Sequence, residues 1–229
     1  MAQPQTSAMQ PTERSDDKPK KRKRVPRAVR EPQMLDAATE VFSERGFHAA
    51  SMDDIAARVE VTKPMLYAYF GSKEGLYRAT IERAGDHIIK VVEALMSEPD
   101  ARKRLCTGTD ALLDFVFSQR AAWSVIYNEG MGPDGLVDIT GIRDKVSSFI
   151  ARTFAEVKRG QVGNNGASEP SEAEVETAWP FAIGTIGSCE AVLRWWTGRE
   201  RFDQEACRRI CQDLVQSHLD GFLGTARAA

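Results

Sequence analysis

Apolar residues recur every three or four positions through most of the chain, which is the spacing of helices that bury one face. The first such segment runs from residue 31 to residue 45, with Leu35, Ala38 and Phe42 on one side, and Gly46 ends it. No segment shows the strict alternation of apolar and polar residues that predicts a half-buried strand. The pattern therefore predicts an all-α protein.

A second apolar segment, residues 51–77, is divided by turns into short helices. Ser51 precedes an apolar run and is followed three residues later by Asp54, a capping-box pattern that begins a helix. After a turn at Glu60, Thr62 is placed to cap a second helix. The segment therefore predicts two short helices in close succession, followed by a longer one.

The second short helix is expected to keep one face free. Leu66 and Phe70 are four residues apart and point into the core, which leaves Lys63 and Tyr67 outside. Two short helices joined by a tight turn, with a basic and aromatic surface on the second, are typical of a DNA-binding helix-turn-helix. A helical hairpin with tyrosines between its helices is the alternative that the pattern leaves open.

Residues 35–76 resemble the DNA-binding domain of the tetracycline-repressor (TetR) family of bacterial transcription regulators. The motifs of that family match here at Gly46, Phe47, Ser51, Ile55, Ala56, Leu66, Tyr67, Tyr69, Phe70, Lys73, Glu74 and Leu76. Two positions depart from the pattern. Glu60 stands where a small residue, often Gly or Ala, is usual, and Pro64 stands where Gly is frequent. The resemblance implies an N-terminal three-helix domain of the helix-turn-helix type, linked to a larger helical ligand-binding and dimerisation domain.

The predicted DNA contacts fall into two groups. Lys63 and Tyr67 are expected in the major groove, where Pro64 and Met65 could touch a thymine methyl group. Side chains that can reach phosphates are expected to fix the orientation of the protein on a double-stranded operator. They are Ser51, Thr62, Tyr69 and Lys73.

The rest of the chain is expected to be helical, with segments over 73–96, 109–128, 138–159, 171–197 and 202–223, and residues 97–104 are expected to be a polar break between the first two. By resemblance, the first of these connects the DNA-binding domain to middle helices that surround a small-molecule pocket. The last two are then expected to pair with their copies in a second subunit. The predicted domains are a disordered basic arm (1–30), a helix-turn-helix domain (31–77) and a regulatory and dimerisation domain (78–226).

The last two helices support two interpretations. Gly184, Gly187 and Ser188 are small and would allow close helix approach, and Ile186 and Leu214 add apolar area. These positions could form an intramolecular core or the seam of a homodimer. A palindromic operator requires two recognition helices about 34–36 Å apart or a multiple of that spacing, which favours the seam.

Aromatic residues on the middle helices are candidates for the ligand pocket, although such residues are more often part of a core. They are Phe115, Trp123, Tyr127, Trp179 and Phe181. A pocket with several aromatic rings and few polar groups would suit an apolar or aromatic effector.

Charge is distributed unevenly along the 229 residues, whose formal net charge is −2. Residues 18–30 contain eight Lys or Arg and no acid. A solvated tail, a nuclear localisation signal and an arm that contacts DNA all fit this composition. The arm is favoured because it runs directly into the DNA-binding domain.

Other classes of protein receive little support from the sequence. The three histidines, His48, His87 and His218, are scattered, and no metal motif or phosphate loop appears, so neither an enzyme nor a cofactor or metal site is predicted. Four cysteines are too few for a disulfide framework, and no run of 18 apolar residues or secretory signal is present. We therefore expect a cytoplasmic repressor that an effector releases from DNA. An effector-independent DNA-binding protein or an activator is the alternative.

Overall fold

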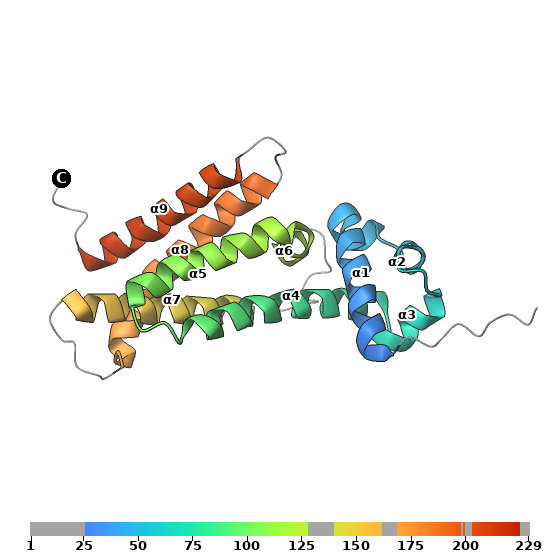
Figure 1. The fold of residues 1–229 in the computed structure, drawn as a ribbon, viewed down its shortest axis with the longest axis horizontal. Helices are drawn as coiled ribbons and strands as arrows, with labels where there is room; N and C mark the ends of the chain where they lie inside the picture. Colours follow the sequence, from blue (N-terminus) through green and yellow to red (C-terminus); the bar gives the residue numbers. More distant parts are fainter. Residues whose placement is uncertain (1–25, 128–139, 162–168, 198, 200–202, 225–229) are drawn as a thin grey trace, which may run out of the picture.

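The computed structural model describes residues 26–127, 140–161, 169–197, 199 and 203–224, and these residues form α-helices without a strand. The helices are α1 (Arg27–Ala49), α2 (Met52–Arg58), α3 (Lys63–Phe70), α4 (Lys73–Leu95), α5 (Ala101–Ser118), α6 (Arg120–Tyr127), α7 (Thr140–Gln161), α8 (Glu172–Thr197) and α9 (Gln204–Leu223). The all-α prediction is confirmed. Helices α1–α3 form a small unit at one end of α4, the rest of α4 contacts α5, α6 and α7, and α8 and α9 pack on the far side of those helices (Figure 1).

The N-terminal unit is built from short-range signals that the sequence carries. Ser51 caps α2, because its hydroxyl oxygen accepts a hydrogen bond from the Asp54 N–H at 3.1 Å, and the capping prediction is confirmed. Gly71 ends α3 with φ of 77°, and the hydroxyl of Ser72 caps α4. Gly46, with φ of 74°, interrupts α1 where the sequence predicts its end.

Helix α1 begins at Arg27, four residues before the predicted start. Pro32 lies inside the helix, in its second turn. Arg27 pairs with Glu31 at 2.9 Å along the helix surface, and Arg30 donates to Gln33, so polar side chains support the first turns. The end of the predicted basic arm is therefore helical, and the arm itself over residues 1–25 lies outside the described part of the chain.

Glu60, in the turn between α2 and α3, has φ of 54°, the left-handed conformation that costs a side-chain-bearing residue about 1–2 kcal/mol. Its side chain is exposed, so a substitution there changes little besides the backbone. We expect Glu60→Gly to raise the free energy of unfolding by about 0.5–1 kcal/mol, since glycine also loses entropy on folding. Urea denaturation measures the change. Glu60→Ala is the control and should bring no gain, so equal effects of the two variants would contradict the explanation.

The helix predicted over residues 109–128 begins earlier and ends earlier in the structure. The sequence predicts a polar break over 97–104 and one helix over 109–128, whereas α5 begins at Ala101 and stops at Ser118. Asp100 starts it by accepting hydrogen bonds from the N–H groups of Arg102 and Lys103. Gln119 has φ of −122° and ψ of 47°, which separates α5 from α6.

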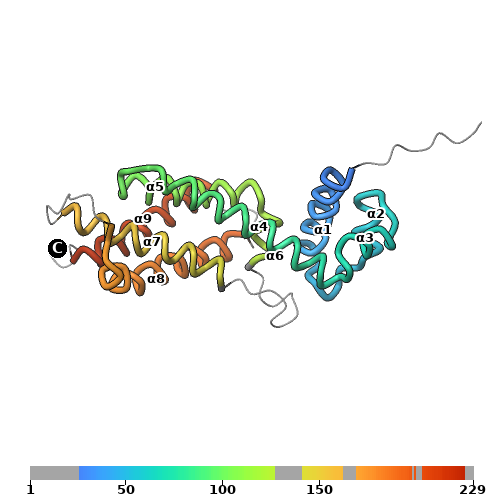
Figure 2. The backbone as a smooth tube through the Cα atoms, turned by 90° about the horizontal axis from the view of Figure 1, so that it is seen from below, coloured from blue at the N-terminus to red at the C-terminus, as the bar shows by residue number. Residues whose placement is uncertain are grey.

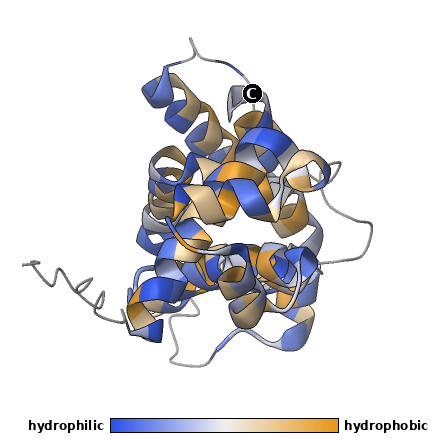
Figure 3. Cartoon of the chain, turned by 90° about the vertical axis from the view of Figure 1, so that its right-hand side faces the viewer, coloured by the Kyte–Doolittle hydropathy of each residue, from blue (hydrophilic) through white to orange (hydrophobic). Residues whose placement is uncertain are grey.

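Helices α4–α9 form a layered bundle in which α8 packs extensively against both α7 and α9 (Figure 2). Hydrophobic and hydrophilic residues are interspersed along the helices (Figure 3), as expected where each helix buries one side. Gly85 lies where α4 meets α7, and a Cβ there would displace the tip of the Ile142 side chain. In the described segments, none of the helices has the length and apolar character needed to span a bilayer.

Candidate DNA-binding surface and ligand cavity

The exposed side of α3 carries most of the residues that the sequence assigns to DNA. Leu66 is fully buried, and α3 packs against α2 and α4, which anchors the helix so that Tyr67 stands out with 42% of its surface exposed. Pro64 and Met65 are also exposed. Thr62 occupies the N-cap position with an exposed side chain that makes no capping hydrogen bond. The predicted cap at Thr62 is therefore absent, and its hydroxyl faces outward.

Lys63 lies at the start of α3 beside an acidic residue of α2. Its Nζ donates a hydrogen bond to Oδ2 of Asp53 at 2.8 Å, and this hydrogen bond raises the pKa of Lys63 above its ordinary value. Both side chains are exposed, so the pair contributes little to stability. Asp53 holds the ammonium group on the outer side of the helix-turn-helix.

The remaining predicted phosphate contacts have structural roles as well. The Ser51 hydroxyl is occupied in capping α2, and the half-buried ring of Tyr69 has the Arg27 guanidinium 4.9 Å from its centroid. Lys73 donates to the carbonyl oxygen of His48 at 3.2 Å, with its Nζ 4.6 Å from the centre of the Phe47 ring. Ser51, Tyr69 and Lys73 therefore make contacts within the N-terminal unit, in addition to the phosphate contacts predicted for them.

The N-terminal unit is joined to the bundle through α4 and α6. Tyr77 of α4 is buried, and its ring makes edge contacts with Phe42 and Phe47 of α1 at centroid distances of 5.0 Å. Its hydroxyl donates to the carbonyl oxygen of Val125 in α6 at 3.4 Å. Arg83 of α4 adds a hydrogen bond to the Pro32 carbonyl of α1 at 3.1 Å. The two parts of the protein are thus connected by direct packing.

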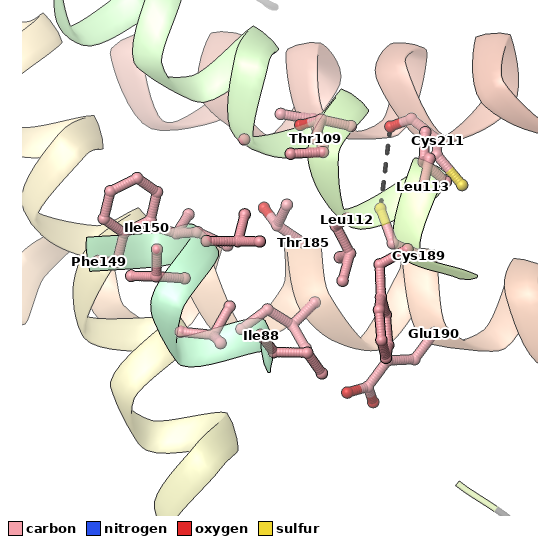
Figure 4. A pocket seen from close by; sticks show the side chains of 18 of the residues that line it. Ile88, Thr109, Leu112, Leu113, Phe149, Ile150, Thr185, Cys189, Glu190 and Cys211 are labelled. Carbon is pink, nitrogen blue, oxygen red and sulfur yellow. Dashed lines mark hydrogen bonds between the residues drawn. The ribbon is translucent and has the colours of Figure 1, made fainter. Parts of the chain in front are cut away.

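A cavity of about 90 Å³ lies inside the bundle, with walls from α4, α5, α7 and α8 and smaller contributions from α6 and α9 (Figure 4). Its walls are mainly aliphatic, with Ile88, Leu112 and Ile150 on three different helices. An apolar cavity of about 150 Å³ is large enough for benzene, so this one holds a small apolar group as it stands. A larger ligand requires the surrounding helices to separate.

Two charged residues meet at the wall of the cavity. Glu190 of α8 is only 4% exposed, and its Oε2 lies 2.8 Å from Nη2 of Arg143 in α7. The carboxylate is thereby neutralised in an otherwise apolar setting, as a buried charge requires. Thr109 and Thr185 add hydroxyl groups to the lining.

The predicted pocket aromatics divide into two groups. Phe115 and Trp123 line the cavity. Trp179 and Phe181 do not, because they lie in the first half of α8, where Phe181 packs on Phe222 of α9 with ring centroids 5.5 Å apart. The side chain of Tyr127 lies outside the described residues. The aliphatic walls and the two thiols were not predicted, since nothing local in the sequence distinguishes such residues from core residues.

The outer face of α8 and α9 carries exposed apolar side chains. Ile183 is 51% exposed, and Trp195 and Ile210 are exposed as well. Gly187 adds a small residue to this face, with nothing within 4 Å of the position where a Cβ would lie. Gly184 instead serves the contact between α8 and α9, because a Cβ there would lie 3.1 Å from Nε2 of His218.

Known proteins resemble both halves of this arrangement. The family model described as "Bacterial regulatory proteins, tetR family" matches residues 34–80, from the core of α1 into α4. The HTH-type transcriptional activator FasR of Mycolicibacterium smegmatis is 41% identical over 179 residues, which cover 78% of this chain and 77% of that protein. The biofilm operon icaADBC negative transcriptional regulator IcaR of Staphylococcus aureus (strain Newman) is 29% identical over 131 residues, 55% of this chain and 69% of IcaR.

The fold is also known from a solved structure. The crystal structure of a TetR-like transcriptional regulator from Rhodococcus sp. RHA1 superposes with a TM-score of 0.69 at 34% sequence identity, covering 86% of this chain and all of the other. The helix-turn-helix, the helical bundle packed against it and the similarity to these relatives all point to the same family. This chain belongs to the tetR family of bacterial regulatory proteins and is a DNA-binding transcription regulator, not an enzyme.

Proposed function

We propose that the protein binds a palindromic operator as a homodimer, through residues 31–77 of each subunit, and that a ligand in the domain formed by residues 78–226 controls this binding. The observation that carries the proposal is the exposed face of α3, where Lys63 and Tyr67 project from a helix anchored by buried Leu66. Lys63 and Tyr67 read base edges in the major groove, and Pro64 and Met65 lie against the bases. Ser51, Thr62, Tyr69 and Lys73 contact phosphates.

The DNA contact is tested with an operator selected from a random pool of duplexes. We expect Lys63→Ala and Tyr67→Ala each to weaken operator binding by about 1–3 kcal/mol and to relax sequence preference, because both side chains reach base edges. Fluorescence anisotropy at fixed salt concentration measures the affinities. Asp53→Asn is the matched control: it removes the partner of Lys63 and a negative charge near the phosphates, so it should not weaken binding. Unchanged affinity in both alanine variants would refute the groove assignment.

The dimer is proposed to form through α8 and α9. These helices lie side by side, and their outer face presents Ile183, Gly187 and Ile210 (Figure 1). Small and apolar residues on one face let two copies of a helix pair approach closely in a two-fold contact. Ile186 belongs to a different surface, since it lines the cavity, so it is not a suitable position for testing the seam.

The effector is proposed to be an apolar small molecule that enters the cavity. The aliphatic walls and the rings of Phe115 and Trp123 support this chemistry, and the Arg143–Glu190 pair supplies a polar anchor at one wall. Because about 90 Å³ accommodates only a small group, a larger effector must move the helices that surround it. In the first form of the proposal, the protein is a repressor that this movement releases from DNA.

Transcriptional activation is a second candidate, favoured by the name of the FasR relative, whereas the IcaR relative is named a negative regulator. Both forms use the same DNA surface and the same cavity. Transcription in vitro from a template carrying the selected operator and its adjoining promoter separates them. A transcript that increases when protein is added supports the activator, and one that decreases supports the repressor.

A further inference from the structure

Three of the four cysteines gather where α8 meets α9. Cys189, Cys207 and Cys211 are buried, whereas Cys106 on α5 is exposed. Cys189 and Cys211 line the cavity, and the Cys189 thiol donates a weak hydrogen bond to the carbonyl oxygen of Cys211, with Sγ 3.8 Å from that oxygen (Figure 4). Two thiols therefore border the cavity that we propose as the ligand site.

The three buried thiols differ in how readily they ionise. A hydrogen bond from the Cys211 thiol lowers the pKa of Cys189, and this outweighs the opposing effects of burial and of the Glu190 charge. Burial raises the pKa of Cys207 to about 12. The partnership with Cys189, together with burial, raises the pKa of Cys211. Cys189 also lines the cavity, whereas Cys207 does not, so both access and ionisation favour reaction at Cys189 over Cys207.

The walls of the cavity restrict what can reach this sulfur. The cavity beside Cys189 is lined by Leu112, Leu113 and Ile88 (Figure 4). A charged reagent would lose its hydration on entering this apolar space. A compact apolar molecule gives up little favourable hydration free energy when it enters the cavity. Reagents with charged groups are therefore directed to the exposed Cys106, and apolar reagents gain access to Cys189.

We propose that Cys189 is a covalent capture site for small apolar α,β-unsaturated carbonyl compounds, an inference that rests on the cavity being the ligand site of the proposed function. The sulfur electron pair forms a bond to the β-carbon of the compound. The π pair of the carbon–carbon double bond shifts through the carbonyl group, and the proton lost from the thiol ends on the α-carbon. All atoms of both reactants remain in the thioether adduct, and no oxidant or reductant takes part.

The adduct has a consequence that reversible binding lacks. A group bonded to Cys189 stays in the cavity after free compound is removed, and it fills space between α5, α8 and α9. A change in operator affinity caused by the adduct therefore persists through dialysis. This makes the site a sensor of electrophile exposure, rather than of electrophile concentration at one moment.

The test uses full-length protein with Cys106→Ser, which removes the exposed thiol. Cyclohexenone is the probe, and cyclohexanone, which has the same ring without the double bond, is the matched control. We expect intact mass to increase by one cyclohexenone and peptide mapping to locate it at Cys189, with a rate more than about tenfold that at Cys207. Cys189→Ala in the same background should give no adduct, and cyclohexanone should leave the mass unchanged. Peptide mapping of the wild-type protein gives the same information should a variant fold poorly.

Two results overturn the inference in distinguishable ways. If cyclohexanone changes the fluorescence of Trp123 but cyclohexenone leaves Cys189 unmodified, the cavity binds apolar molecules and only the covalent site is wrong. If neither compound binds and Cys189 reacts only in denaturant, the cavity does not admit such molecules, and the proposed ligand site fails together with the inference. Modification of Cys189 and Cys207 at equal rates would also overturn it, because the assigned reactivity would then be absent.

Discussion

Replacing Ile183 by glutamate is expected to convert the protein to monomers and to remove tight operator binding. Ile183 is 51% exposed on the outer face of α8, and the proposed seam buries it against a second copy. Glutamate there would place an uncompensated charge from each subunit in an apolar contact, at a cost of about 3–5 kcal/mol, or roughly 100- to 5000-fold in the dimerisation constant. Because both recognition helices must engage one operator, the loss of the dimer weakens DNA binding as well.

Met96→Glu provides a matched control for this prediction. Met96 follows the end of α4, away from α8 and α9, and it is also 51% exposed. The same change of charge at the same exposure should leave the mass in solution and the operator affinity unchanged. Sedimentation equilibrium at micromolar concentration measures the first quantity, and anisotropy titration measures the second. A wild-type protein that is monomeric under these conditions, or an Ile183→Glu protein that stays dimeric, would show that the seam lies elsewhere.

The N-terminal unit was largely predictable because its signals are local. The cap at Ser51 requires only Asp54, three residues away, and Gly71 ends α3 by adopting a positive φ. Glu60 was recognised as a departure from the family pattern, and its φ of 54° explains why glycine suits this position. Each feature involves residues within one turn of each other, which is the range over which sequence pattern is informative.

The start of α5 was missed although its cap at Asp100 is local, because the segment looked polar and the burial of Arg104 depends on a partner distant in the sequence. Arg104 was assigned to a polar break, yet it is buried with its Nη1 2.7 Å from Oε2 of Glu156 on α7. It also donates to the carbonyl oxygen of Glu98. A charged side chain predicts an exposed position unless its partner is known, and 52 residues separate this partner from Arg104.

The cavity could not be located from the sequence for a similar reason. Helix α8 is apolar on several sides, so its periodicity does not assign each side to a role. Ile183 and Ile186 are three residues apart, but one faces outward and the other lines the cavity. Gly184 and Gly187 differ in the same way: Gly184 lies at the contact with α9, whereas Gly187 lies on the outer face of α8. Only the placement of α5, α7 and α9 around α8 separates these surfaces.

A ligand that fills the cavity is expected to change operator affinity by about 5- to 150-fold, a coupling of about 1–3 kcal/mol. The route is short. Trp123 of α6 lines the cavity, and two residues further on the Val125 carbonyl accepts the hydrogen bond from Tyr77. The ring of Tyr77 then contacts Phe42 of α1. Helices displaced by a ligand too large for the cavity would therefore shift α1 and, through α2, which packs between them, the recognition helix α3.

Linkage requires the same factor in reverse, since the operator must change ligand affinity by as much as the ligand changes operator affinity. Trp123 supplies the signal, because a ligand beside its ring alters tryptophan fluorescence. Titrating such a ligand with and without operator gives the two affinities. Equal values would show that occupancy of the cavity does not control DNA binding, whichever sign regulation has.

Tyr77→Phe tests the route itself, because it keeps the ring and removes only the hydroxyl that reaches α6. We expect it to reduce the coupling by about 0.5–2 kcal/mol while changing either affinity alone much less. Thr80→Val is the matched control: the Thr80 hydroxyl is also buried on α4, but it donates to the Tyr77 carbonyl within the same helix. Coupling should survive in Thr80→Val and fall in Tyr77→Phe. If both variants retain full coupling, the signal passes from the cavity to α1 along α4 without the contact between Tyr77 and α6.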